Sequence, residues 1–248
     1  MKTKLFKNKW VKRVSVVVLG ITSLFMANIA TAQSRKLVDV ETTDDLKILK
    51  PQFVSVDMAF GNESPKDDKS VIACFGAAFT GERLLKFSHN NIAGPHAGGG
   101  KKYKGYSCPR NTGAFVYSNG SWEFLYGGYK NKNYDLELSK AAKNGGCGFE
   151  QEMVIFKNQR VETTRPLDNE NIFRVLCDKD GELLIVESTA SVAFGDFIDS
   201  LMNYGVDNAL YLDMGTWRYG WYRPTNDTIE ELQPRIHNFH TNWLIFKK

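Results

Sequence analysis

The sequence predicts an α+β fold: a single globular domain of mixed β-sheets built of hairpins, plus one strand–helix–strand unit. Short apolar segments repeatedly flank turns rich in Asn, Asp and Gly, which is the pattern of β-hairpins. At residues 194–205 the apolar period changes to that of an amphipathic helix. Because strands and helices do not alternate regularly along the chain, a doubly wound sheet is not expected.

Residues 1–32 have the organisation of a secretory signal peptide. Residues 1–13 contain six basic residues and no acid, an apolar run follows over 14–29, and Ala30-Thr31-Ala32 supplies the small-x-small pattern of a cleavage site. A membrane anchor is the alternative, but the run is short for a span of about 20 residues. We therefore expect cleavage after Ala32, a periplasmic or secreted protein, and no stable membrane span in the mature chain.

Removal of the leader changes the charge of the chain. The whole sequence has 32 basic and 28 acidic residues, and the six basic residues of the leader leave 26 against 28, a net charge of −2. Nucleic acid is therefore not an expected partner. Residues 33–68 are polar and acid-rich and are expected to form a partly ordered segment, with the compact domain spanning 69–248.

Within 69–248 most strands are expected in pairs. A strand at 70–75 runs into a turn of small residues, and Asp135 can cap a helix over 136–143 that Gly145 and Gly146 end. Three hairpins are expected at 114–126, 153–161 and 172–187, with turns at 118–121, 157–158 and 178–181.

A strand–helix–strand unit is expected over 182–213. Apolar residues recur there at helical spacing and Gly205 follows the last of them. The apolar residues concerned are Phe194, Phe197, Ile198, Leu201 and Met202. A strand at 209–212 comes next, and the crossover of about twenty residues is long enough to join parallel strands.

Four cysteines follow the leader, and an exported chain can oxidise them in three alternative pairings. Cys74 and Cys177 lie in apolar, strand-like runs, which favours two buried thiols. Cys108 and Cys147 lie in glycine-rich loops, so they are the pair expected if a disulfide forms.

The strand at 209–212 ends on Asp213, and Gly215 follows two residues later. A lone carboxylate where a buried strand meets a loop favours a ligand at the carboxyl end of that strand. A turn acid is the alternative, but the residues after Asp213 do not begin a helix. Trp217 and its aromatic neighbours suit stacking on a sugar face, the alternative being a solvated hairpin edge.

Arg174 lies inside an apolar strand, where a guanidinium needs an anionic partner. Glu187, on the second strand of the same hairpin, is one candidate partner. An anionic ligand is the other, and the sequence does not decide between them.

Side-chain donors crowd the glycine-rich loop 86–110, a composition that suits a phosphate or a sugar. Asn91, His96 and Lys102 are the binding residues expected there. Gln151 lies between two glutamates, a cluster that either lines a cleft or faces water. No metal site is expected, because His237 and His240 have no third ligand at matching spacing.

Residues 70–246 resemble the phosphodiester glycosidase family, that of the enzyme that uncovers mannose 6-phosphate, which has many exported bacterial members. Three blocks carry the likeness: 151–158, 173–186, and the helix with the strand that ends in Tyr211-Leu-Asp-Met-Gly215. Arg174, Asp213, Gly215 and Gln151 fall on positions of the family pattern.

The resemblance implies a hydrolase that splits a sugar-1-phosphodiester without a cofactor. Arg174 would hold the phosphate, and Asp213 would stabilise the sugar cation or activate water. The residues expected to bind substrate are Gln151, Gly215, Thr216, Trp217, Asn91, His96 and Lys102.

Two departures from the family pattern define an alternative. Met214 replaces the first glycine after Asp213, and the segment 74–79 lacks the asparagine of the family's N-terminal motif. The alternative is therefore a non-catalytic envelope glycan- or phosphoglycan-binding protein on the same fold.

Overall fold

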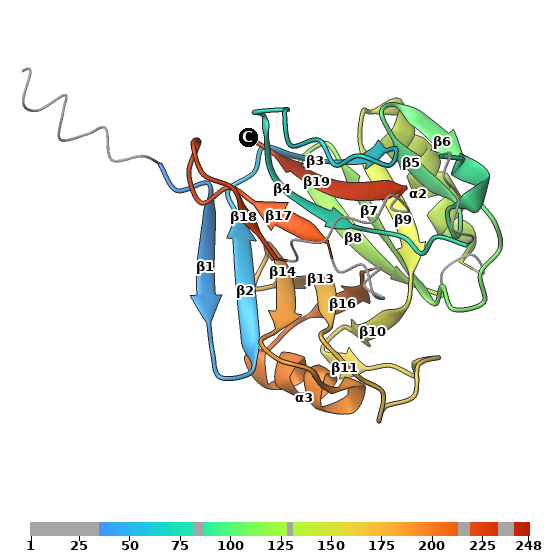
Figure 1. The fold of residues 1–248 in the computed structure, drawn as a ribbon. Helices are drawn as coiled ribbons and strands as arrows, with labels where there is room; N and C mark the ends of the chain where they lie inside the picture. Colours follow the sequence, from blue (N-terminus) through green and yellow to red (C-terminus); the bar gives the residue numbers. More distant parts are fainter. Residues whose placement is uncertain (1–34, 82–86, 128–130, 213–218, 233–240) are drawn as a thin grey trace, which may run out of the picture. The chain divides into compact units, whose positions relative to one another are not determined.

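Sheets of antiparallel strands form most of the compact unit Lys36–Lys248 in the computed structural model (Figure 1). The structure describes residues 35–81, 87–127, 131–212, 219–232 and 241–248. Within these ranges, one sheet has seven strands, two have five, and a short pair joins β12 (Glu170–Asn171) to β15 (Val192–Ala193). No helix in the described ranges is both long and apolar enough to cross a membrane. The α+β class predicted from the sequence is confirmed.

The seven-stranded sheet contains the predicted strand–helix–strand unit. Its order is β1-β2-β14-β13-β16-β10-β11, and every neighbouring pair is antiparallel. Its strands are β1 (Val38–Thr42), β2 (Leu46–Pro51), β14 (Glu182–Ser188), β13 (Arg174–Lys179), β16 (Asn208–Tyr211), β10 (Met153–Phe156) and β11 (Gln159–Arg160). Since β13 lies between β14 and β16, those two strands run parallel, and α3 (Phe194–Tyr204) connects them.

The two five-stranded sheets bring distant parts of the chain together. One has the order β18-β17-β4-β19-β3 and the other β6-β5-β9-β7-β8. The first comprises β18 (Glu230–Glu231), β17 (Gly220–Tyr222), β4 (Val71–Gly76), β19 (Asn242–Lys247) and β3 (Ser55–Phe60). The second comprises β6 (Lys101–Tyr103), β5 (His96–Gly98), β9 (Cys147–Gln151), β7 (Gly113–Ser118) and β8 (Ser121–Tyr126).

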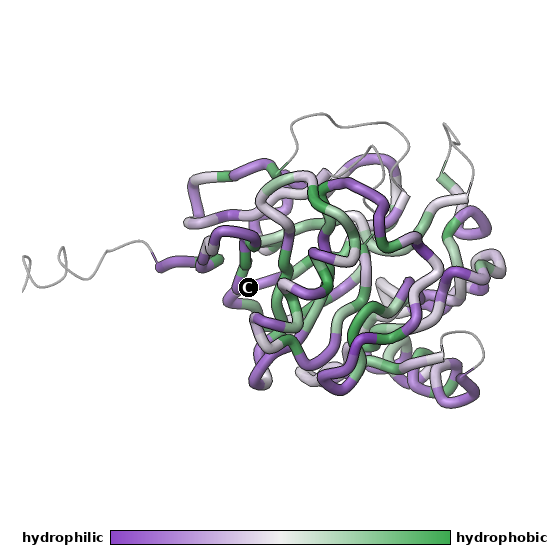
Figure 2. Tube along the Cα trace, turned by 90° about the horizontal axis from the view of Figure 1, so that it is seen from below, coloured by the Kyte–Doolittle hydropathy of each residue, from purple (hydrophilic) through white to green (hydrophobic). Residues whose placement is uncertain are grey.

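Apolar side chains are buried on both faces of the seven-stranded sheet. One face contributes Leu176 and Leu210 to a core shared with the strands of both five-stranded sheets. The other packs against α3 through Val175 and Phe197. Helix α2 (Lys132–Lys143) covers a separate small core on the sheet that contains β7 and β9. Figure 2 shows the apolar segments along the inner strands and the hydrophilic segments mainly at turns.

The predicted hairpins are all present, and their turns have the backbone that the sequence requires. At the β7–β8 turn Asn119 and Gly120 have φ of 52° and 79°, and at the β13–β14 turn Asp180 and Gly181 have 52° and 77°. Asn, Asp and Gly tolerate positive φ, which the tight turns of hairpins need. Gly205, at φ 86°, ends α3 as expected.

Two boundaries expected from the sequence are wrong. Compact structure begins at Lys36 rather than Lys69, because β1, β2 and β3 join the sheets through partners far along the chain. Helix α2 starts at Lys132 rather than 136, because the Asn131 side chain, not Asp135, caps it by accepting from the Asn133 amide at 3.0 Å.

All four cysteines are buried thiols in the structure, so Cys108 and Cys147, the pair expected if a disulfide forms, are not bridged. Cys147 lies on β9 opposite Tyr117 instead of in a loop. Its side chain belongs to the main hydrophobic core, where burial raises the pKa of the thiol well above its usual range. Cys74 and Cys177 are buried on strands, as the sequence indicates.

Candidate functional site

Arg174 is hydrogen-bonded to the two residues that flank the segment 213–218. Leu212 ends the approach to this segment, and its amide donates to the Arg174 carbonyl at 3.0 Å. Tyr219 is the first described residue after the segment, and its carbonyl accepts from Arg174 Nη1 at 3.4 Å. Asp213, Gly215, Thr216 and Trp217 themselves lie outside the described residues.

The Arg174 guanidinium is buried and ion-paired. Its side chain is 1% exposed, Nε donates to Glu187 Oε2 at 2.9 Å, and Nη2 donates to the same oxygen. The two residues lie directly opposite each other in the β13–β14 pair. The guanidinium carbon also lies 5.4 Å from the centre of the Phe75 ring. Of the two partners considered from the sequence, the structure contains the glutamate.

Gln151 is fully buried at the end of β9, and both polar atoms of its side chain are bonded. Nε2 donates to the Ala77 carbonyl at 3.2 Å, and Oε1 accepts from the Glu152 amide at 2.9 Å. Asn242 brackets the next residue, Ala78, by bonding both its amide and its carbonyl. The structure therefore brings Gln151 and Arg174 to the same short stretch at the end of β4.

Glu150 and Glu152 flank Gln151, and both carboxylates are fully buried. Sequence reasoning gave Glu150 little weight and did not single out Glu152, because charged residues in a cluster usually face water. Glu150 Oε2 accepts from Asn111 Nδ2 at 3.4 Å, whereas its Oε1 has no hydrogen-bond partner in the described chain. Burial raises the pKa of this carboxyl to about 7. Near neutral pH Glu150 therefore exists as a mixture of acid and carboxylate.

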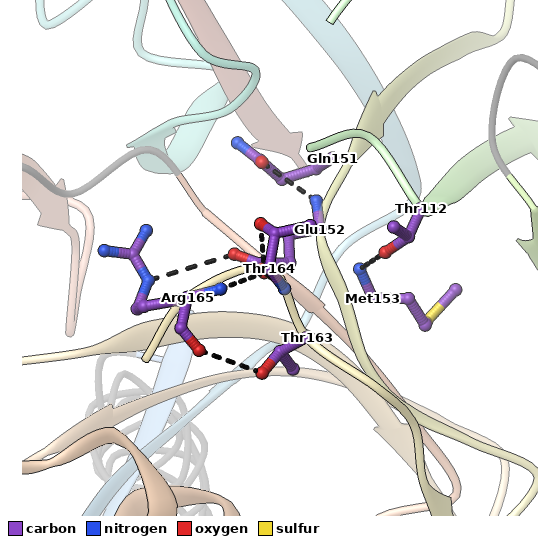
Figure 3. A network of polar contacts seen from close by, with 7 residues as sticks. All are labelled: Thr112, Gln151, Glu152, Met153, Thr163, Thr164 and Arg165. Atoms are coloured by element: carbon purple, nitrogen blue, oxygen red, sulfur yellow. Dashed lines mark hydrogen bonds and ion pairs between the residues drawn. The ribbon is translucent and has the colours of Figure 1, made fainter. Parts of the chain in front are cut away.

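Glu152 is held from the loop that follows β11. Its Oε1 accepts from the Thr164 amide at 2.5 Å, the Thr164 hydroxyl at 2.7 Å and the Arg165 amide at 3.1 Å (Figure 3). Arg165 Nε lies 3.8 Å from the other oxygen, Oε2. The Glu152 carbonyl also accepts from the Tyr211 amide at 2.8 Å, which connects this loop to the last residue of β16. In the sequence, the only indication of a role for Glu152 is its position next to Gln151.

The remaining predicted binding residues gather around the β5–β6 hairpin. His96 is fully buried, bonds the Gly94 carbonyl through Nδ1 at 3.0 Å, and contacts His89 through Nε2 at 3.1 Å. Burial lowers its pKa to about 4, so this histidine is neutral at physiological pH. Asn91 is buried in the short helix His89–Asn91. Lys102 bonds the Asp135 carboxylate and the Ser139 hydroxyl, which ties β6 to α2.

No group of three His, Cys, Asp or Glu side chains suitable for a metal ion occurs within the described ranges. The polar groups that the structure does bring together at the carboxyl end of β16 are one buried arginine, one buried glutamine and a loop-bound glutamate. All three side chains are buried, so hydrolytic chemistry at this place requires a further acid or base.

Comparison with known proteins identifies the fold. No family model and no curated protein sequence matches the chain. The catalytic domain of zebrafish N-acetylglucosamine-1-phosphodiester α-N-acetylglucosaminidase, in a structure auto-inhibited by its pro-peptide, matches with a TM-score of 0.57 at 13% identity. The match covers 87% of this chain and 83% of that chain.

A hypothetical protein from Synechocystis matches with a TM-score of 0.47 at 12% identity, over 85% of this chain and 61% of that one, which is too distant to support an argument. The zebrafish enzyme supports a fold-level likeness that agrees with the resemblance seen in the sequence. This chain has the fold of a phosphodiester glycosidase catalytic domain.

Proposed function

We propose that this protein is an exported hydrolase that cleaves a sugar-1-phosphodiester at the bond between the sugar and the phosphate. One observation carries the proposal: Arg174 is hydrogen-bonded to the residues that precede and follow the segment containing Asp213. Arg174 and Asp213 both fall on positions of the family pattern, and the described residues on either side of the segment 213–218 are the ones that bond Arg174. The fold shared with the zebrafish glycosidase supports the same reaction class.

The proposed chemistry needs little help for the leaving group. Water replaces the phosphate oxygen on the anomeric carbon, the C–O bond breaks, and the products are a free sugar and a phosphate monoester. The second pKa of a phosphate monoester is about 6, so it departs without strong general acid catalysis. The remaining requirements are a cation near the phosphate and a carboxylate near the anomeric carbon.

In the proposal, Arg174 supplies the cation and Asp213 supplies the carboxylate. The ion pair with Glu187 fixes the guanidinium in one orientation, which suits the geometric demands of phosphate recognition. Gln151 has a supporting role, because its amide holds the Ala77 carbonyl and thereby the end of β4.

The test substrates are the methyl 1-phosphodiesters of N-acetylglucosamine, mannose and glucose. We expect the purified mature protein to release free sugar and methyl phosphate from at least one of them. The Asp213→Asn variant, which keeps the size of the side chain, should lose at least about 100-fold in kcat/KM, the scale of a lost electrostatic or acid–base contribution. Full activity of this variant would remove Asp213 from the mechanism.

A second function is favoured by the Glu187 partner of Arg174. A buried arginine whose charge is already balanced attracts a phosphate less strongly than one without a carboxylate. The competing proposal is therefore a non-catalytic glycan- or phosphoglycan-binding protein of the cell envelope. Saturable binding of the same phosphodiesters, with no sugar released from any of them, would decide for this second function.

Export is part of the first proposal, and residues 1–32 lie outside the described residues. The basic start, apolar run and small-residue site of this segment support it. Mass spectrometry of the protein recovered from the periplasm or the medium should give Gln33 as the first residue. Recovery of the uncleaved chain in the membrane fraction would contradict export by this route.

A further inference from the structure

A small polar cavity lies beside Glu152, on the loop between β11 and β12. Its volume is about 140 Å³, and its lining residues are Arg110, Glu152, Thr164, Arg165, Pro166 and Asn169. All of these residues belong to the described chain. The Glu152 carbonyl accepts from the amide of Tyr211, which precedes Asp213 by two residues in the sequence.

The Glu152 carboxylate is satisfied on one oxygen and not on the other. Oε1 accepts three hydrogen bonds from Thr164 and Arg165, as Figure 3 shows. Oε2 is buried and has no hydrogen-bond partner within the described ranges, and the same holds for Arg165 Nε. The two atoms are 3.8 Å apart, close enough to attract each other but too far for a hydrogen bond. A buried acceptor without a donor is rare in folded proteins, and here it belongs to a residue that lines a cavity.

The Arg165 guanidinium is held in position by aromatic rings. Its central carbon lies 4.5 Å from the centre of the Tyr211 ring and 5.4 Å from that of Phe194. These contacts place the cation over the end of β16 and fix the direction of its donors. Arg165 therefore forms a preorganised wall of the cavity.

Arg110 adds a second positive charge. Its side chain is exposed at the cavity, and no ion pair joins it to a described acid. With Glu152 balanced by Arg165, the lining has an excess of one positive charge. The cavity therefore has an exposed guanidinium that suits an anion and a buried acceptor that suits a hydroxyl group.

We propose that this cavity binds a small hydroxylated phosphate monoester, with its phosphate on Arg110 and a hydroxyl group donating to Glu152 Oε2. This inference rests on the proposed function, because such a molecule is the leaving group released when a sugar-1-phosphodiester of a polyol is hydrolysed. It names the substrate class of the enzyme as polyol phosphodiesters. A bound phosphate alone would satisfy Arg110 and leave Glu152 Oε2 without a donor, so the polyol part of the ligand is essential.

Calorimetric titration of the mature protein with glycerol 3-phosphate, inorganic phosphate and glycerol tests the proposal without any turnover. We expect glycerol 3-phosphate to bind at least about tenfold more tightly than inorganic phosphate, the scale of one added charge-assisted hydrogen bond. Glycerol alone should give no measurable heat, because it lacks the anion.

Two variants and a control assign the site. Glu152→Gln can keep the Oε1 acceptor but replaces Oε2 with a donor, so it should abolish the preference for glycerol 3-phosphate over phosphate. Arg110→Ala changes an exposed side chain and should weaken both phosphate ligands about tenfold. Lys143→Ala removes one positive charge from the exposed end of α2 and should leave both affinities unchanged.

Equal affinities for glycerol 3-phosphate and inorganic phosphate, or an Arg110→Ala variant that binds as the wild type does, would overturn the inference. These results are distinguishable from failure of the proposed function. A protein that binds glycerol 3-phosphate through Glu152 but releases no sugar keeps the site and loses the reaction. A protein that releases sugar from every alcohol equally, with no binding at Glu152, keeps the reaction and loses the site.

Discussion

The buried carboxyl of Glu150 predicts that stability falls as the pH rises. Burial raises its pKa from the ordinary value of 4.5 to about 7, with the hydrogen bond from Asn111 opposing the rise. The folded state therefore binds a proton between these values that the unfolded state has released. The stability contributed by this proton is complete below pH 4.5, declines as the pH rises to 7, and is absent above it. At about 1.4 kcal/mol for each pKa unit, the loss is about 3 kcal/mol.

Glu150→Gln removes this titration and keeps the shape of the side chain. We expect the variant to exceed the wild type by up to about 3 kcal/mol in free energy of unfolding at pH 8 and to match it within about 1 kcal/mol at pH 4.5. Urea denaturation followed by tryptophan fluorescence at both pH values gives the difference. Glu123→Gln, at an exposed position on β8 of the same sheet, is the control and should show no such pH dependence. An equal effect of Glu150→Gln at the two pH values would refute the reasoning.

Three further predictions concern the same region and the buried ion pair. The pKa of His96 is lowered from 6.5 to about 4, so the neutral ring stabilises the fold above pH 6.5 and this stability is lost as the pH falls to 4. His96→Gln should therefore reduce the fall in free energy of unfolding between pH 6.5 and pH 4. An unchanged fall would contradict this. Gly94→Ala should destabilise by more than about 2 kcal/mol, since its Cβ would lie 2.4 Å from a buried carboxylate oxygen, whereas Gly99→Ala, with open space around it and also positive φ, should cost about 1 kcal/mol in thermal unfolding. Arg174→Met should lower the free energy of unfolding by about 3 kcal/mol, because it leaves Glu187 without its partner. Adding Glu187→Leu to the same chain should recover part of that loss. A double variant whose loss equals the sum of the two single losses would contradict the pairing.

The sequence predicts the local elements of this fold well. Each hairpin is specified by its own turn residues, such as Asn119-Gly120 and Asp180-Gly181, whose positive φ values the structure shows. Helix α3 has an apolar face of regular period and a glycine at its end, so its position also follows from local information.

The early strands could not be predicted in the same way, because their partners are distant. Strand β3 pairs with β19, joining Val56 to Phe246, and β2 pairs with β14, joining Leu49 to Ile185. Their short, partly polar sequences form strands only when these partners are present. The composition of residues 33–68 therefore suggested less order than the structure has.

The contacts of the candidate site could be predicted from the sequence only where the pairing of two strands determines them. Arg174 and Glu187 are directly opposite in one hairpin, so their pairing was one of two alternatives from the sequence. Glu152 and Arg165 meet because a loop folds back across a strand end, and no pattern in the sequence specifies that contact. Burial of Glu150 depends likewise on the Asn111 and Gly94 segments, which pack over it from separate loops.

The position of bond cleavage tests the central claim most directly. Hydrolysis of a sugar-1-phosphodiester in water enriched in oxygen-18 labels whichever product receives the water oxygen. Cleavage between the anomeric carbon and oxygen, as proposed, places the label in the free sugar and leaves the phosphate monoester unlabelled. Label in the phosphate monoester would show attack at phosphorus, and it would contradict the assignment of this protein as a phosphodiester glycosidase.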